Sequence, residues 1–207
     1  KGSRITAATQ LLTYSDMTIF ENRGRRTLNE ASTVEEFLGL RADLGAFALG
    51  SYFAELLETV SAEEYPDPPV LQLGLNSLYA LSRALCPPEQ IKAVFELRLM
   101  CLAGYEPDLS CCARCGAPEP AEPWLSLRGG AVYCAQCRGA SSSAVTPLLP
   151  ETLAAMRHVV NADPKRIFSF TLGDAGRRQL ARVCEEYTAM QLERGFASLD
   201  YWKKVKD

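Results

Sequence analysis

The sequence predicts an α+β protein in which a short β-rich segment precedes a helical body, and a cysteine-rich insert interrupts the helices. Three observations support this fold class. β-branched and aromatic residues fill segment 4–30, apolar residues then recur at helical spacing, and five of the eight cysteines lie within residues 111–137. We assign residues 1–31 to the β-rich segment and residues 32–207 to the helical body, with the insert at residues 109–140.

The β-rich segment contains two stretches, residues 5–12 (ITAATQLL) and 16–21 (DMTIFE), whose composition predicts strands. Residues 22–24 (NRG) have the composition of a tight turn. Only two or three strands fit here, and an isolated hairpin of that size is marginally stable in water. Because the sequence starts at Lys1 without an initiator methionine, we expect a piece of a longer chain whose earlier strands complete a sheet.

The helical body begins where the hydrophobic period changes, after a Ser-Thr-Val-Glu-Glu pattern at residues 32–36 that is typical of a helix N-terminus. Proline pairs and Gly104 mark the ends of successive helices. We expect Asp174 to cap the last long helix and Gly195 to follow its end. The expected helices span residues 33–62, 70–85, 88–103, 150–160, 163–168 and 174–194.

The insert carries two C-x-x-C pairs separated by 18 residues, a spacing typical of a structural zinc site. Two residues between thiolates let both sulfurs reach one ion at about 2.3 Å. Gly116 relieves the first turn, because glycine adopts positive φ without strain. Gly129 and Gly130 separate two short apolar stretches and predict a hairpin. The insert is thus predicted to be a zinc ribbon, and the expected Zn²⁺ ligands are Cys112, Cys115, Cys134 and Cys137.

Four thiolates would close the tetrahedron and leave no position for a reactive water, so the predicted zinc is structural. A redox C-x-x-C pair and an iron–sulfur cluster are alternative interpretations. The redox alternative would make the protein an oxidoreductase, and it leaves the second pair unexplained. Cys111 is adjacent to a ligand and is a spare thiol. We interpret the scattered Cys86, Cys101 and Cys184 as buried thiols in a reducing compartment.

Charge, hydropathy and motifs argue against several classes of function. The net charge of −3 argues against a surface that grips nucleic acid over its whole extent, although local basic patches remain. The apolar runs are far shorter than the roughly 18 residues of a membrane span. The common catalytic motifs do not occur, and the single histidine, His158, is more typical of a packed or surface residue than of a base. The sequence therefore predicts a protein that is not an enzyme.

Residues 95–116 (FELRLMCLAGYEPDLSCCARCG) resemble the centre of the bacterial recombination mediator RecO family, in which a helix runs directly into a zinc knuckle. Residues 2–31 resemble the later strands of that family's N-terminal OB-fold, although its first strands are missing. Residues 43–58 (DLGAFALGSYFAELLE) and 193–202 (ERGFASLDYW) match two further helices of the family. The resemblance implies a partial N-terminal OB-fold fragment, followed by an α-helical domain with an inserted four-cysteine zinc ribbon.

The resemblance implies a non-enzymatic recombinational DNA-repair mediator that binds and anneals DNA. Such proteins bind single- and double-stranded DNA, partner RecR, dock the acidic C-terminal tail of single-strand-binding protein and help to load RecA. They are cytoplasmic proteins of the bacterial nucleoid, and no membrane is involved. The alternative is a zinc-ribbon scaffold for protein interactions that has no intrinsic DNA binding; the net charge of −3 favours this alternative until the resemblance is considered.

Phosphate contacts require Lys or Arg, and an acidic tail requires an apolar groove rimmed by cations. The expected DNA-binding residues, all on the β-rich segment, are Arg4, Arg23, Arg25 and Arg26. The weaker candidates for binding the tail, on the helix at 88–103, are Lys92 and Arg98. A second candidate for the tail is the face of the last long helix with Arg177, Arg178 and Arg182.

Overall fold

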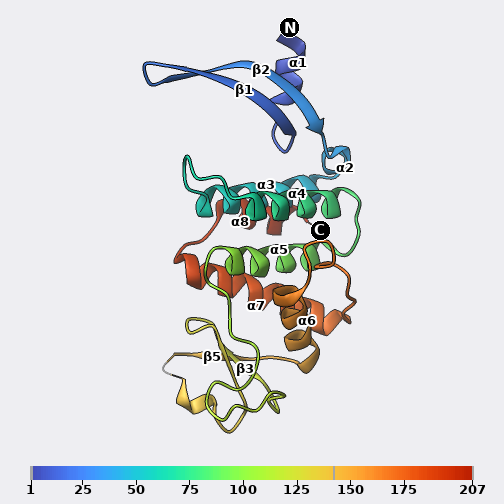
Figure 1. Cartoon of the computed structure of the whole chain (residues 1–207). Coiled ribbons are helices and arrows are strands. Elements are labelled where there is room, and N and C mark those ends of the chain that lie inside the picture. The colour runs from blue at the N-terminus through green and yellow to red at the C-terminus, as the bar shows by residue number, and fades with distance from the viewer. Residues whose placement is uncertain (1, 142, 207) are drawn as a thin grey trace.

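The computed structural model describes residues 2–141 and 143–206, and its elements form three tiers (Figure 1). A β-hairpin with a short helix lies at one end, layers of helices lie in the middle, and a small sheet lies at the other end. The helices are α1 (Gly2–Ala8), α2 (Leu38–Arg41), α3 (Leu44–Val60), α4 (Pro68–Ser82), α5 (Pro88–Leu102), α6 (Pro150–Asn161), α7 (Asp174–Leu192) and α8 (Ala197–Val205). The strands are β1 (Tyr14–Asn22), β2 (Arg25–Glu35), β3 (Trp124–Ser126), β4 (Ala131–Tyr133) and β5 (Val145–Pro147), and a 3₁₀ turn covers Arg138–Ala140.

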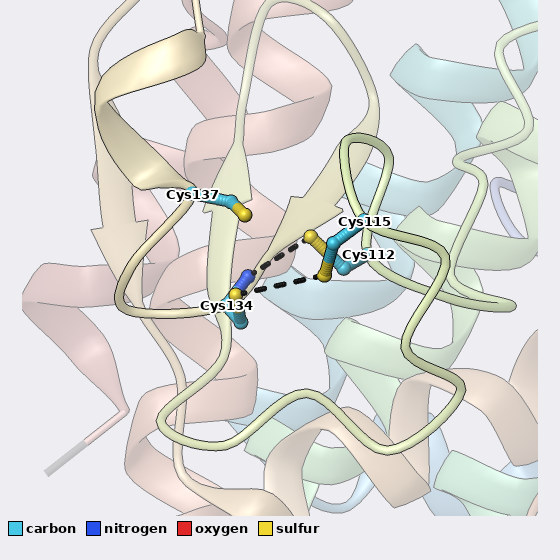
Figure 2. A group of neighbouring side chains, drawn as sticks. All are labelled: Cys112, Cys115, Cys134 and Cys137. Atoms are coloured by element: carbon cyan, nitrogen blue, oxygen red, sulfur yellow. Dashed lines mark hydrogen bonds between the residues drawn. The ribbon is translucent and has the colours of Figure 1, made fainter.

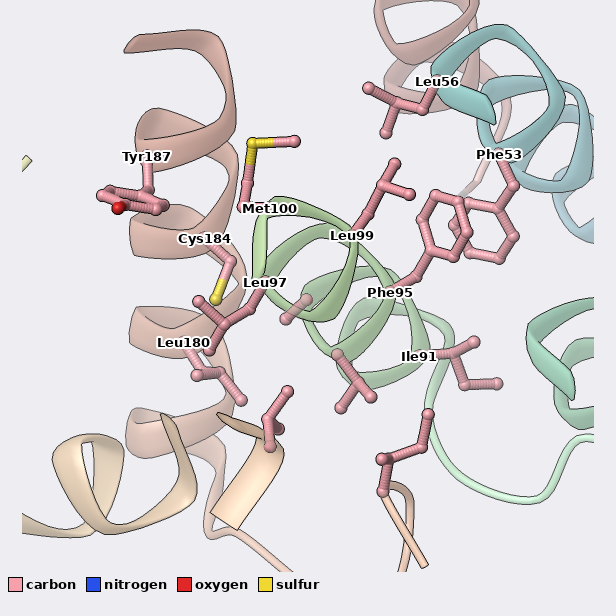
Figure 3. Packing of buried hydrophobic residues seen from close by; sticks show 14 of the residues in the cluster. Phe53, Leu56, Ile91, Phe95, Leu97, Leu99, Met100, Leu180, Cys184 and Tyr187 are labelled. Atoms are coloured by element: carbon pink, nitrogen blue, oxygen red, sulfur yellow. The ribbon is translucent and has the colours of Figure 1, made fainter. Parts of the chain in front are cut away.

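Helix α5 is the centre of the hydrophobic core. Ten of its fifteen residues are buried, so it has no solvent-facing polar stripe of the kind that surface helices show. On one side, Phe95 stacks on Phe53 of α3 with ring centroids 4.2 Å apart (Figure 3). On the other side, Leu180 and Cys184 of α7 pack against Leu97 (Figure 3). The helical body is therefore built around α5, with α3 and α7 on either side of it.

The N-terminal tier corrects one predicted strand. Residues 5–12 were expected to be extended, but helix α1 covers the first half of this stretch, turns cover the rest, and only β1 and β2 form the sheet. Alanines favour the helix, and Ala8 is buried in the structure. The predicted turn at residues 22–24 is confirmed, because Asn22 pairs with Arg25 across it.

The predicted helix over residues 33–62 begins eleven residues before α3 does. Strand β2 continues to Glu35, which pairs with Tyr14, so the β-rich segment extends beyond residue 31. The chain then turns at Phe37, whose φ is 47°, into the single turn of α2. Helix α3 starts only after Asp43, whose side chain accepts a hydrogen bond from the N–H of Ala46 at 2.7 Å.

The other predicted helices agree better with the structure. Helices α4, α5 and α6 lie within a few residues of the predicted ranges, and Gly104 adopts a φ of 88° after α5 as expected. The stretch 163–168, expected to be a short helix, forms turns instead. Gly173 rather than Asp174 is the N-cap of α7, and Glu193 rather than Gly195 adopts the left-handed conformation at its end.

The third tier is an antiparallel sheet in the order β4-β3-β5. The hairpin β3–β4 was predicted from its glycine turn, whereas β5, which lies beyond the expected end of the insert at residue 140, was not. Leu125 of β3 and Val132 of β4 are buried in the same hydrophobic cluster as the helices. In the described part of the chain, no helix combines the length and apolarity that crossing a bilayer requires.

Candidate metal centre and nucleic-acid interface

Four cysteines from two separate turns converge beside the hairpin β3–β4 (Figure 2). In the first turn, the N–H of Gly116 donates to the carbonyl of Cys112 at 2.9 Å, and Gly116 has the positive φ that the sequence predicts. In the second turn, the N–H of Cys137 donates to the carbonyl of Cys134 at 2.9 Å. The two C-x-x-C pairs therefore form two similar knuckles that face each other.

The geometry of the cluster fits one tetrahedral ion. The four sulfurs lie within 4.8 Å of one another, and the sulfurs of Cys115 and Cys134 are 3.9 Å apart. Four ligands at about 2.3 Å from a tetrahedral ion have sulfurs about 3.8 Å apart. The four predicted ligands thus lie together at the separation that a shared metal ion requires, and soft thiolates are suited to zinc or iron.

The pKa values of the clustered cysteines also favour a bound cation. Burial of the Cys112 sulfur raises its pKa, but backbone N–H groups of Cys115, Cys134 and Arg114 outweigh this effect and lower the pKa to about 6. Hydrogen bonding to Cys134 and the other thiols raises the pKa of Cys137 to about 12. Cys112 therefore loses its proton readily, whereas Cys137 keeps its proton mainly through these hydrogen bonds. A bound divalent cation would take the place of such protons between the sulfurs.

The ribbon is attached firmly to the helical body. Tyr187 of α7 donates its hydroxyl to the carbonyl of Tyr105 at 2.8 Å, and Gln191 donates to the carbonyl of Leu127 at 2.7 Å. Arg157 of α6 donates to the carbonyl of Leu109 at 2.7 Å and also reaches Pro118 and Glu119. The sequence gives no sign of these roles, because only the fold brings α6 and α7 beside the first knuckle.

Three of the four expected DNA-binding arginines have described side chains. Arg23 and Arg25 are exposed at the tip of the hairpin β1–β2, where they flank Gly24. Arg4 lies in α1, but its side chain lies outside the part of the chain that the structure describes. The structure thus presents two exposed arginines at the hairpin tip.

Arg26 is held by three carboxylates. Its Nε lies 3.1 Å from Glu21 on the opposite strand, while Nη1 and Nη2 lie 2.6 and 3.1 Å from Glu63 and Glu64 in the loop between α3 and α4. The hydrogen bond with Glu21, followed in size by the one with Glu63, raises the pKa of Arg26 above its usual value. Arg26 therefore joins the hairpin to the helical body in this structure.

Lys92, a weak candidate for binding a partner's tail, is buried in this structure. Lys92 is 1% exposed and lies between Glu96 at 3.0 Å and Glu185 at 2.9 Å. Tyr52 donates its hydroxyl to Glu96 at 2.8 Å and completes the network. Burial opposes the charge of Lys92, but the two glutamates outweigh it and raise its pKa. The amine belongs to a buried network that joins α3, α5 and α7.

Arg98, the other residue predicted to bind the tail, also contacts the protein's own backbone. Its guanidinium is partly buried and donates to the carbonyls of Val159 and Val160, at the end of α6. On α7, Arg177 pairs with Asp174 at 2.6 Å and Arg182 pairs with Glu186 at 3.0 Å, whereas Arg178 is exposed. Lys92 and Arg98, the two residues first predicted to bind the tail, thus form contacts between helices.

His158 takes part in packing in the described structure. Its Nε2 lies 3.0 Å from the carbonyl oxygen of Arg166, and its ring packs edge-on against Phe170.

The ribbon itself carries three arginines. Arg114 and Arg128 are exposed, and the guanidinium of Arg138 lies over the ring of Trp124.

Comparison with known proteins identifies the family of this fold and cysteine cluster. A family described as "Recombination protein O C terminal" matches residues 41–200, which include α3 to α7, the ribbon and part of α8. The chain belongs to the RecO family of DNA repair proteins. The resemblance inferred from the residues around the first knuckle is therefore confirmed.

Relatives named DNA repair protein RecO match nearly the whole chain. The protein from Acetivibrio thermocellus is 30% identical over 203 residues, which are 98% of this chain and 80% of that protein. The protein from Heliobacterium modesticaldum is 32% identical over 190 residues, which are 89% and 68% of the two chains. The protein from Alkaliphilus metalliredigens is 28% identical over 204 residues, 98% and 82%. Similarity to RecO proteins thus extends beyond the range of the family match.

Proposed function

We propose that this RecO-family protein is a non-enzymatic recombination mediator. It binds single- and double-stranded DNA, anneals complementary strands, and works with RecR and single-strand-binding protein to load RecA in the cytoplasm, at the nucleoid. The observation that carries the proposal is the RecO family match over residues 41–200, with relatives named DNA repair protein RecO that cover up to 99% of the chain.

The proposed DNA platform is the hairpin β1–β2 as part of an OB-fold. Arg23 and Arg25 are exposed at its tip, and cations in such positions neutralise phosphates. Phe20 on β1 is 61% exposed, and an exposed aromatic ring is a surface on which bases stack. Cations beside an exposed ring suit a single strand without sequence preference.

The proposed metal is one structural Zn²⁺ held by the four cysteines of the ribbon. When bound, the ion would neutralise the clustered thiolates and cross-link the two knuckles. The buried positions of Cys112 and Cys134 tie it to the sheet that packs against the helical core. Zinc therefore supports the fold of the ribbon and takes no part in a reaction.

DNA binding is tested by titrating a fluorescent single strand with the chain at several salt concentrations. Replacing Arg23 and Arg25 by glutamine should weaken binding. It should also reduce the slope of log affinity against log salt by about 1.4, which is about 0.7 for each lost phosphate contact. The control, Lys165→Gln with Arg166→Gln, removes the same charge from an exposed turn in the helical body. Equal slopes for the two variants would contradict the hairpin platform.

The metal is tested by measuring zinc content after purification without added chelator. We expect one zinc per chain, lost in Cys134→Ser and kept in the matched control Cys111→Ser, because Cys111 lies beside the cluster but outside it. Loss of zinc in both variants, or in neither, would contradict the assigned ligand set.

The partners are tested by calorimetric titration with purified RecR and with a peptide of the C-terminal tail of single-strand-binding protein. We expect both to bind and the tail peptide to lose affinity as salt rises, because its recognition is electrostatic. A scrambled peptide of the same charge is the control. Equal binding of the two peptides would contradict specific docking of the tail.

A protein-interaction scaffold without intrinsic DNA binding is the second candidate. The net charge of −3 and the engagement of Arg26 by three carboxylates favour it. It predicts that RecR binds while single strands do not bind even at low salt. The DNA titration described above therefore separates the two functions.

A further inference from the structure

The guanidinium of Arg26 is saturated by carboxylates from two different parts of the chain. Each of its three nitrogens lies within 3.1 Å of a separate glutamate. Glu21 lies directly opposite on the hairpin, but Glu63 and Glu64 belong to the loop between α3 and α4, 37 and 38 residues further along. In Figure 1 this loop rises from the helical body toward the hairpin.

A turn in the loop between α3 and α4 places Glu63 and Glu64 beside Arg26. In this turn, the N–H of Tyr65 donates to the carbonyl of Ala62, and Glu64 adopts a φ of 67°. A non-glycine residue in this left-handed conformation is strained, so the turn persists only where other contacts support it. The ion pairs with Arg26 are the contacts that this part of the structure supplies.

The charges around the hairpin tip cancel. Three arginines (Arg23, Arg25 and Arg26) are balanced by Glu21, Glu63 and Glu64, and the two loop glutamates are 78% and 75% exposed. An approaching phosphate therefore meets no net positive charge, and the most inward arginine is already occupied. Without the two loop glutamates, the same tip would carry a net charge of +2.

We propose that the loop at residues 61–67 is an autoinhibitory strap that occupies Arg26 and is displaced by a DNA strand on the hairpin. The inference rests on the proposed DNA-binding function of the hairpin. A carboxylate and a phosphate present similar oxygen pairs to guanidinium, so one replaces the other on Arg26. Displacement frees Arg26 for the strand and removes this ion-pair link between the hairpin and the helical body, to which the loop belongs.

The energetics permit this exchange. Both ion pairs are exposed, and exposed pairs are weak enough for a polyanion to displace. A competing DNA strand also releases condensed counterions when its phosphates are neutralised. The loop glutamates release no such counterions when they pair with Arg26. The strap thus lowers DNA affinity without preventing binding, and it also opposes weak contacts with other anions.

The test compares two double variants of the full chain in the single-strand titration. Glu63→Gln with Glu64→Gln removes the strap's charges. Glu36→Gln with Glu58→Gln, the control, removes the same charge from exposed positions that form none of the described ion pairs of Arg26. We expect the strap variant to bind about twofold to thirtyfold more tightly than the wild type, and the control to change affinity less than twofold.

A third variant isolates the role of Arg26. The gain from removing the strap should disappear when Arg26→Gln is added, because the glutamates act through this arginine. Equal gains in the strap and control variants, or a gain that survives Arg26→Gln, would contradict the strap while leaving DNA binding intact. Absence of DNA binding in every variant would instead contradict the proposed function, and the inference with it.

A measurement without DNA gives an independent check. Hydrogen exchange of amides in β1 and β2 should be faster in the strap variant, because the hairpin loses its ion-pair link to the helical body. Exchange in α5 should be unchanged, since α5 packs in the core. Unchanged exchange in the hairpin would show that the loop does not restrain it.

Discussion

Helix α5 and the hairpin β1–β2 differ most in what surrounds them. Neighbouring helices bury Phe95 on α5 completely, whereas Phe20 on β1 is 61% exposed and both faces of its two-stranded sheet are largely open. Both segments contain large apolar side chains, although α5 is richer in them, with nine apolar residues of fifteen against seven of twenty-two in residues 14–35. The stability of this protein therefore lies in α5 and its neighbours, while the hairpin keeps Phe20, Arg23 and Arg25 exposed for contacts.

The largest difference is expected for one phenylalanine in each region. Phe95→Ala removes a fully buried ring that stacks on Phe53, and we expect it to lower the free energy of unfolding by about 4 kcal/mol. Phe20→Ala, the matched change in the hairpin, should cost less than about 0.5 kcal/mol. Chemical denaturation monitored by circular dichroism checks both. Similar losses would mean that the hairpin packs against a surface that the described structure does not include.

A smaller but substantial effect is expected for the buried charge network. Lys92→Met removes the amine between Glu96 and Glu185 and leaves Glu96 buried without its cation, which should cost about 3 kcal/mol. Lys204→Met makes the same change on exposed α8, and we expect less than about 0.5 kcal/mol. The same denaturation series measures both, and equal midpoints would show that the buried network contributes nothing.

The pH dependence of the free energy of unfolding should show the contribution of Glu185, the least buried member of this network. Burial opposes the charge of Glu185, but Lys92 and Lys203 outweigh it and lower its pKa below the usual 4.5. A lowered pKa in the folded state gives stability that is present above pH 4.5 and lost as the pH falls through the folded value. Glu185→Gln should therefore cost about 1 kcal/mol at pH 7 and progressively less toward pH 3. A cost that does not depend on pH would contradict this assignment.

The smallest effect is expected at the hairpin turn. Arg23 has a φ of 51° and precedes Gly24 at 76°, a pair of left-handed conformations in which asparagine is favoured at the first position. Arg23→Asn should stabilise the hairpin by about 0.5 kcal/mol, seen as slower hydrogen exchange in β1 and β2. Arg25→Asn, on the strand side of the turn, is the control and should give no protection.

Sequence reasoning succeeded where the deciding interactions are local. Helices α4 to α6 follow from hydrophobic period and proline positions, and the cysteine cluster follows from spacing and Gly116. The extension of β2 to Glu35 could not be predicted in this way, because its pairing with Tyr14 is made across the hairpin. Local signals instead favoured a helix start at residues 32–36, which belong to β2 and the turn after it.

The cysteine cluster could be predicted from the sequence, but the ion-pair networks of Lys92 and Arg26 could not. The clustered cysteines could be named from the sequence, whereas the sequence predicts Lys92 to be a tail-binding cation and not a buried one. Its burial depends on α7, which lies far along the chain and supplies Glu185. The contacts of Arg26 with Glu63 and Glu64 likewise depend on tertiary structure, because an arginine in a strand and two acids in a loop carry no signal that they meet.

The place of the ribbon in the chain has a consequence for the order of folding. Helices α5 and α7 pack together in the core, but residues 103–173 separate them and must close as a loop before they can meet. Loop closure costs conformational entropy, and non-local pairing slows folding. If the ribbon between them forms first around the proposed Zn²⁺, the flexible part of that loop becomes much shorter. The metal would then speed the assembly of a core that it does not touch.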